Sequence, residues 1–133
     1  MEPNRHPAQH AQPSADRLRD VYQECREQDW DGYDALPVSE ATFTNATTFL
    51  QLLPTDLAAK ADPGAEPDGN LTLEWYIDTD YQISISIDAQ SRLHFAAAVG
   101  PRRKRRGTDT FSEGVPQDVV DIITEVLEHD RLE

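Results

Sequence analysis

The segment 71–99 contains three consecutive runs in which apolar and polar residues alternate. Successive side chains of a strand point to opposite faces, so a period of two predicts strands with one apolar face and one polar face. The links 78–80 and 88–91 have hairpin length and are rich in residues that favour turns. The segment therefore predicts a three-stranded antiparallel meander. Its apolar positions are Leu71, Leu73, Trp75 and Ile77, then Tyr81, Ile83, Ile85 and Ile87, and finally Leu93, Phe95, Ala97 and Val99.

Three amphipathic segments flank the meander and predict helices at about 15–28, about 40–53 and Pro116 to about Glu128. Ser14 and Ser39 stand immediately before two of these segments and are predicted N-caps. A sheet with one apolar face must bury that face against another layer. The chain is therefore predicted to be an α+β two-layer sandwich, in which an antiparallel meander of three to four strands is covered on one face by helices, in the order α-α-β-β-β-β-α.

The chain of 133 residues has room for one domain. Residues 1–14 carry three prolines and no periodicity, which predicts a disordered tail before a single α+β domain over 15–133. His6 and His10 lie in this tail, where a spacing of four has no geometric meaning, so we predict no metal site there. Residues 54–69 contain three prolines and two glycines and predict a long loop, with a short helical turn near its start.

The net charge of the chain is −13, from 12 basic and 25 acidic residues. This balance disfavours general attraction to nucleic acid or anionic lipid, and it suits a partner with a basic surface. The single cysteine, Cys25, cannot form an internal disulfide, which fits a reducing compartment. No apolar run has the length of a signal-peptide core or the roughly 20 residues of a membrane span. We expect a cytoplasmic protein that does not enter a membrane.

The sequence motifs of common enzyme classes are missing: there is no Gly-rich phosphate loop, no pair of zinc-binding cysteines and no nucleophile elbow. His94 is predicted to lie beside Ser84 or Ser86 across a hairpin, which mimics a base and a nucleophile but is more often a polar surface. Cys25 lies on the apolar stripe of the first predicted helix and is interpreted as a core residue. The chain is therefore predicted to be non-enzymatic, with no cofactor and no metal.

The segment 30–39, WDGYDALPVS, is the most distinctive one in the chain. Gly32 and Pro37 interrupt any helix, so the segment is predicted to be a connector. Aromatic side chains among acids suit contact with a basic partner. The alternative is that both aromatic side chains pack against the edges of the helices. The candidate partner-binding residues are Trp30, Asp31, Tyr33 and Asp34.

Five of the basic residues are consecutive, between Gly100-Pro101 and Gly107. We predict a protruding, solvated loop here, followed by a short fourth strand near 108–112. Such a run can neutralise several phosphates of a nucleic acid or meet an acidic partner. The alternative is a solvated loop that pairs with acids of its own domain or of a second copy. The candidate residues are Arg102, Arg103, Lys104, Arg105 and Arg106.

Three segments carry a resemblance to known proteins: 30–39 (WDGYDALPVS), 49–54 (FLQLLP) and 67–75 (PDGNLTLEW). Together they resemble a group of small bacterial proteins of unassigned activity. Members of that group show a WDGYGA-type segment, a helix that ends in Leu-Pro, and a Gly-led strand with Leu-Glu-Trp. The resemblance covers about residues 28–100 and implies a bacterial cytoplasmic origin. The group usually has Gly where this chain has Asp34.

Taken together, these features predict a small acidic interaction protein that binds another protein, as an antitoxin, an immunity protein or a small regulator does. The alternative function is nucleic-acid binding through residues 102–106. The polar face of the meander is flat and is either solvated or packed on another protein, a second copy in a homodimer included. The residues of this face are Thr72, Glu74, Tyr76, Gln82, Ser84, Ser86, Arg92, His94, Ala96 and Ala98.

Overall fold

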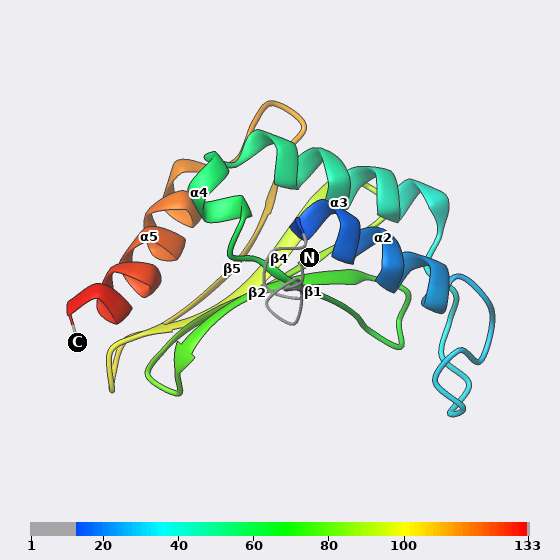
Figure 1. Ribbon diagram of the computed structural model, residues 1–133, viewed down its shortest axis with the longest axis horizontal. Coiled ribbons are helices and arrows are strands. Elements are labelled where there is room, and N and C mark those ends of the chain that lie inside the picture. Colours follow the sequence, from blue (N-terminus) through cyan, green and yellow to red (C-terminus); the bar gives the residue numbers. More distant parts are fainter. Residues whose placement is uncertain (1–12, 133) are drawn as a thin grey trace, which may run out of the picture.

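The computed structural model describes residues 13–132, which form two layers, an antiparallel sheet and the helices on one side of it (Figure 1). In chain order the elements are α2 (Ser14–Cys25), α3 (Glu40–Leu52), α4 (Thr55–Ala58), β1 (Asp62–Ala65), β2 (Leu71–Asp78), β3 (Tyr81–Ile87), β4 (Arg92–Val99), β5 (Lys104–Thr110) and α5 (Gln117–Leu132). The sheet order β1-β2-β3-β4-β5 follows the chain. The predicted α+β two-layer fold is confirmed, with five strands instead of three or four.

The three central strands, β2, β3 and β4, are those predicted from the alternation. Trp75 lies opposite Ile83, and Ile83 lies opposite Ala97, so apolar side chains share one face of the sheet. A register shift between Tyr76 and Asp78 marks a bulge at the end of β2. Apolar residues therefore alternate along each strand, and the apolar residues of neighbouring strands lie opposite one another on the same face of the sheet.

The edge strand β1 lies within residues 54–69, which were predicted to be a loop except for a helical turn. The helical turn is present as α4, but the prediction that the rest of this segment is a loop without a strand was wrong. Pro63 pairs with Leu73, and a Cβ atom on Gly64 would lie only 2.9 Å from Oγ1 of Thr72. Proline and glycine are poor strand formers, yet an edge strand tolerates them because one side of its backbone needs no partner.

The other edge strand, β5, corrects the prediction of a protruding basic loop. The strand begins at Lys104, and its pairing with β4 runs from Lys104 opposite Ala98 to Thr110 opposite Arg92. Repulsion among consecutive cations favours a solvated segment, which is why a loop was predicted. The outer backbone groups of β4 need hydrogen-bond partners, however, and an extended strand supplies them while its side chains stay in solvent. Lysine and arginine on an edge strand also oppose pairing with the edge of another molecule.

The helix ends follow the predictions in part. Ser39 caps α3 as predicted, because its side chain accepts a hydrogen bond from the backbone N–H of Thr42. The predicted cap at Ser14 was wrong: Ser14 is the first residue of α2, and its hydroxyl donates to the carbonyl of Ala61, 3.1 Å away. Residues 1–12 of the predicted tail 1–14 lie outside the described part of the chain.

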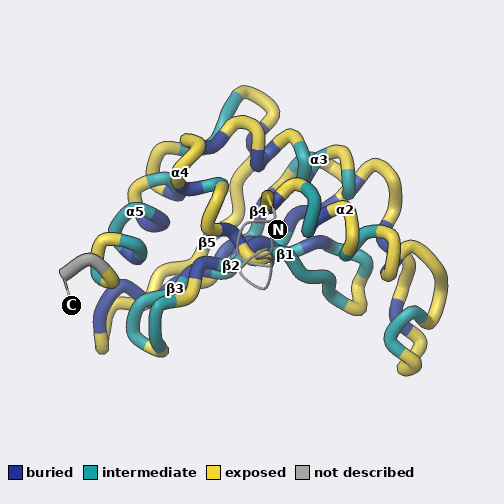
Figure 2. Tube along the Cα trace, in the orientation of Figure 1, coloured by how far each residue is buried: buried dark blue, intermediate teal, exposed yellow. Residues whose placement is uncertain are grey.

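The core lies between the apolar face of the sheet and the inner sides of the helices (Figure 2). Phe49 of α3 meets Phe111 edge to face, with ring centroids 5.3 Å apart. The indole Nε1–H of Trp75 donates to the carbonyl of Leu57 at 2.8 Å, which attaches α4 to β2. This one-sided arrangement leaves the polar face of the sheet uncovered by any helix within the described residues.

Candidate functional site

The loop 26–38, between α2 and α3, carries the predicted partner-binding residues and projects beyond the sheet at the right of Figure 1. Its two ends are joined by a hydrogen bond from the Val38 N–H to the Cys25 carbonyl, at 2.9 Å. A second bond, from the Leu36 N–H to the Pro67 carbonyl at 2.8 Å, attaches the loop to the turn before β2. The base of the loop is therefore fixed to the folded domain.

Two carboxylates organise the interior of this loop. Oδ1 of Asp29 accepts a hydrogen bond from the Asp34 N–H at 2.6 Å. Oδ1 of Asp31 accepts from the N–H groups of Tyr33 and Ala35, at 2.8 and 3.1 Å. Side-chain oxygens thus take the place of a regular backbone ladder, as in Asx turns. The loop has one defined shape because its own acids bind its own backbone.

The tight turn of the loop depends on three left-handed residues. The φ angles of Asp29, Gly32 and Asp34 are 66°, 78° and 67°. Glycine adopts this conformation freely, and aspartate is among the few other residues that tolerate it. The residue that departs from the resembling group, Asp34, therefore still adopts the conformation for which glycine is favoured.

The four candidate residues of the loop play different structural parts. Trp30 packs against the core, and its indole N–H donates to the Leu36 carbonyl at 2.8 Å. Asp31 accepts two hydrogen bonds within the loop, and Asp34 accepts one from the side chain of Gln28 at 2.8 Å. Tyr33, in contrast, is 88% exposed. The alternative that both aromatic residues pack against the helices holds for Trp30 as a core contact and is wrong for Tyr33. Leu36 is 52% exposed but was not among the predicted contact residues; an apolar side chain between turn residues is the sequence signal that indicates it.

The basic residues 102–106 do not form one surface. Lys104 and Arg106 lie opposite Ala98 and Ala96, on the polar face of the sheet, whereas Arg105 lies opposite Ala97, whose side chain faces the helices. Strand alternation therefore divides the run between two faces. Arg103 pairs with Glu125 of α5 at 3.0 Å, which confirms that part of the run meets acids of its own domain.

His94 lies opposite Ser86 in the register, but its ring contacts other groups. Its Nδ1 atom lies 3.1 Å from Oγ1 of Thr108, and its Nε2 atom lies 3.2 Å from Oδ2 of Asp88. The hydroxyl of Ser86 donates instead to Glu66 at 2.6 Å. The predicted position of His94 beside Ser86 is therefore confirmed, but the Ser86 hydroxyl is bound to Glu66, and β5 and the β3–β4 turn supply the partners of the His94 ring.

Asp88 is the buried centre of the β3–β4 turn. Burial opposes its ionisation, but hydrogen bonds from the N–H groups of Gln90 and Arg92, and from the side chains of His94 and Arg92, outweigh burial and lower the pKa of Asp88. The Asp88 carboxylate therefore stabilises the hairpin.

Thr108, His94 and Asp88 lie in the order of a nucleophile, a base and an acid. The Asp88 carboxylate, however, accepts the hydrogen bonds that hold the β3–β4 turn, so its role is structural.

Cys25 is buried at the end of α2. Burial raises the pKa of the Cys25 thiol, and the nearby Glu24 carboxylate raises it further. The thiolate is the reactive form of cysteine, so a raised pKa lowers reactivity at neutral pH. This environment agrees with the interpretation of Cys25 as a core residue.

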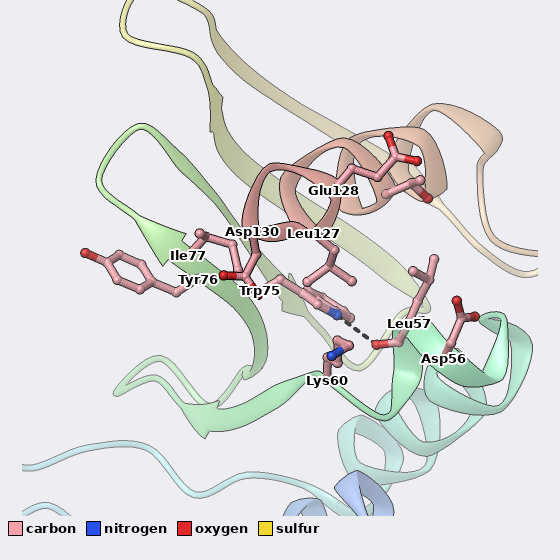
Figure 3. A pocket seen from close by; sticks show the side chains of 10 residues that line it. Asp56, Leu57, Lys60, Trp75, Tyr76, Ile77, Leu127, Glu128 and Asp130 are labelled. Carbon is pink, nitrogen blue, oxygen red and sulfur yellow. Dashed lines mark hydrogen bonds between the residues drawn. The ribbon is translucent and has the colours of Figure 1, made fainter. Parts of the chain in front are cut away.

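A cavity of about 370 Å³ lies between α4, β2 and the last turns of α5 (Figure 3). Its apolar wall includes Trp75 and Leu127, and Lys60 stands at its α4 side, whereas the side chain of Tyr76 points away from it. Three carboxylates also line the cavity, so the site favours a cation over an anion. The carboxylates belong to Asp56, Glu128 and Asp130.

Within residues 13–132, no group of three His, Cys, Asp or Glu side chains is arranged to hold a metal ion. None of the described helices has the length and hydropathy that a bilayer crossing requires. Comparison with protein-family models, with curated proteins and with solved structures found no match to this chain.

Proposed function

We propose that this chain is a small, acidic, non-enzymatic interaction protein of the bacterial cytoplasm that binds another protein through the loop 26–38. The observation that carries the proposal is the position of Tyr33, 88% exposed at the tip of a loop whose backbone is held by its own carboxylates. Antitoxins, immunity proteins and small regulators are the classes of protein that fit this description.

A rigid exposed tyrosine is well suited to be a binding anchor. Tyrosine offers a large amphipathic surface and has only two side-chain torsions to immobilise. Because hydrogen bonds already define the loop, a partner does not have to order it, and less binding free energy is lost. Leu36, half exposed in the same loop, adds an apolar contact.

The charge of the chain indicates the chemistry of the partner. The net charge of −13 attracts a basic surface and repels another strongly acidic one. The loop itself carries Asp29, Asp31 and Asp34 around the exposed ring. We therefore propose a partner whose contact surface is rich in lysine and arginine and contains an apolar recess for Tyr33.

Nucleic-acid binding through residues 102–106 remains the second candidate, because Arg102, Lys104, Arg105 and Arg106 are all exposed. The division of these residues between two faces of an edge strand limits how many can reach one phosphate backbone. The acidity of the rest of the chain repels the same polyanion. Protein binding is therefore the better-supported function.

We propose in addition that the polar face of the sheet serves self-association.

The test compares tagged wild-type chain with Tyr33→Ser, Tyr33→Phe and Leu52→Ser in capture experiments from the source bacterium. Leu52 is a matched control, since it is an exposed apolar residue at the opposite end of α3 from the loop. We expect Tyr33→Ser to lose a stoichiometric protein that the wild type, Tyr33→Phe and Leu52→Ser retain. Capture of no stoichiometric protein by the wild type, or equal capture by all four chains, contradicts the proposal.

A further inference from the structure

We propose that two copies of this chain associate face to face through the polar side of the sheet, about a two-fold axis parallel to the strands between β3 and β4. This inference rests on the self-association proposed above and not on the loop 26–38, and its evidence is the order of charged and small side chains across the sheet. All described helices lie on the opposite side (Figure 1), so the face is open to a second sheet.

One row of side chains across the sheet is complementary to itself. In the register of the four strands, Glu74 lies opposite Ser84, Ser84 opposite Ala96, and Ala96 opposite Arg106. Rotation about the proposed axis exchanges β2 with β5 and β3 with β4, and it preserves the level along the strands. Glu74 of one copy therefore faces Arg106 of the other, twice in the dimer, and Ser84 faces Ala96.

The next row obeys the same symmetry. Tyr76, Gln82, Ala98 and Lys104 are aligned across the sheet, so the rotation sets Tyr76 against Lys104 and Gln82 against Ala98. An ammonium group over a tyrosine ring is a favourable cation–π arrangement. Tyr76 is 55% exposed in the single chain, and this contact covers it.

Small side chains at the centre let the two sheets approach. Ala96 of β4 is exposed and faces Ser84 of the partner's β3, whereas Ala98, opposite the partner's Gln82, is only 3% exposed in the single chain. The charged pairs lie toward the sides. A polar rim around a close-packed centre is the usual layout of a protein interface. Opposite charges across such a rim select the proposed register over one in which acidic strands face each other.

The available area matches a reversible dimer. Strands β2 to β5 are seven or eight residues long, and with spacings of about 4.8 Å and a rise of about 3.3 Å per residue they cover roughly 500 Å² in projection. Two copies then bury on the order of 1,000 Å², near the lower limit for a specific interface. The dimer should accordingly form in a concentration-dependent way.

Association through the sheet edges is the competing geometry, and the charges oppose it. Lysine and arginine side chains on an edge strand oppose its pairing with the edge of a second copy, and Lys104, Arg105 and Arg106 all lie on β5. The opposite edge, β1, has four residues and contains Pro63, which donates no hydrogen bond. The face is therefore the surface that fits a second copy.

The test is sedimentation equilibrium of the full chain with charge reversals. We expect a wild-type monomer–dimer equilibrium, and for Glu74→Arg or Arg106→Glu a rise in Kd on the order of tenfold or more, because like charges then face each other. The double variant Glu74→Arg/Arg106→Glu restores the pairing and should return Kd close to the wild-type value. Glu113→Arg and Lys60→Glu reverse exposed charges off this face and should leave Kd unchanged.

A wild type that stays monomeric at high concentration overturns the proposal, and so does a double variant that does not recover. Thermal melts followed by circular dichroism check that each variant folds. If a single reversal fails to fold, the neutral variants Arg106→Gln and Lys60→Gln decide, since each removes one positive charge and both therefore change the repulsion between two copies of net charge −13 equally. Arg106→Gln must raise Kd above that of Lys60→Gln, and equal Kd values refute the model of paired charges. Capture through Tyr33 should persist in Glu74→Arg, which separates this test from that of the loop.

Discussion

The Asp29 carboxylate accepts a hydrogen bond of 2.6 Å from the backbone N–H of Asp34, and this bond closes the turn that exposes Tyr33. Both residues of the pair have left-handed φ angles. A single side chain thus satisfies a backbone donor and holds two strained residues in place. The geometry of the proposed binding loop therefore depends on Asp29 as much as on the exposed ring.

Replacement of Asp29 should loosen this loop. We expect Asp29→Ala to lower the free energy of unfolding by about 1–3 kcal/mol, because it removes an acceptor and places alanine at a left-handed φ. Asp29→Asn keeps an Oδ1 acceptor and tolerates the same φ, so it should remain near the wild type. Urea denaturation measures both values, and hydrogen exchange of the Asp34 amide should accelerate in Asp29→Ala alone. Equal exchange in the two variants would contradict this account.

Glycine at position 34 should be tolerated or favourable. Asp34 has a φ of 67°, which costs a non-glycine residue on the order of 1 kcal/mol. Asp34→Gly removes that strain but also loses the hydrogen bond from Gln28, so we expect the midpoint of thermal unfolding to stay level or rise slightly. Asp34→Val, β-branched at the same φ, should lower the midpoint. A lower midpoint for glycine than for valine would show that the left-handed conformation is not the controlling feature.

Acid should weaken the fold through Asp88. The folded state lowers the pKa of Asp88, so its contribution is complete above the ordinary aspartate pKa of about 3.9 and is lost as the pH falls through the lower folded value. At neutral pH, we expect Asp88→Asn to lower the free energy of unfolding by about 1–3 kcal/mol, since Nδ2 then faces two donors. The difference should shrink toward strongly acidic pH in urea titrations. Glu113→Gln, an exposed control, should follow the wild type throughout.

A methyl group at position 107 should disturb the attachment of β5. Gly107 lies opposite Phe95, and an added Cβ would stand 2.9 Å from Cε1 of that ring. We expect Gly107→Ala to lower the free energy of unfolding by about 1–3 kcal/mol through this overlap. The double variant Phe95→Leu/Gly107→Ala removes the ring edge and should cost less than the sum of the two single changes in a double-mutant cycle. Additive costs would place the effect elsewhere.

The helical and central strand elements were predictable because their signals are local. The alternation from Leu71 to Val99 indicates which side chains face the core. The spacing of apolar residues around Phe49 and around Ile123 indicates the buried stripe of each helix. Ser39 was recognisable as a cap because its role involves a residue three positions away. Each of these patterns is a property of neighbouring residues in the chain.

The proposed site was predictable only as a region. The segment 30–39 was identified by its glycine, proline and aromatic residues, yet nothing in it distinguishes the ring that packs inward from the one that projects. Trp30 turns inward because the Leu36 carbonyl and the core receive it, whereas Tyr33 stands at the apex between Asp31 and Asp34. That choice depends on the hydrogen bonds that close the loop.

By itself, the sequence determined the layering of this protein: alternation and helical spacing require an apolar sheet face covered by helices. Only the tertiary structure decided that residues 62–65 and the cations from Lys104 onward are strands, and that Ser14 binds Ala61 instead of capping its helix. The reason is that an edge strand is selected by the unpaired backbone groups of its neighbour, which the side-chain pattern of the edge segment does not record.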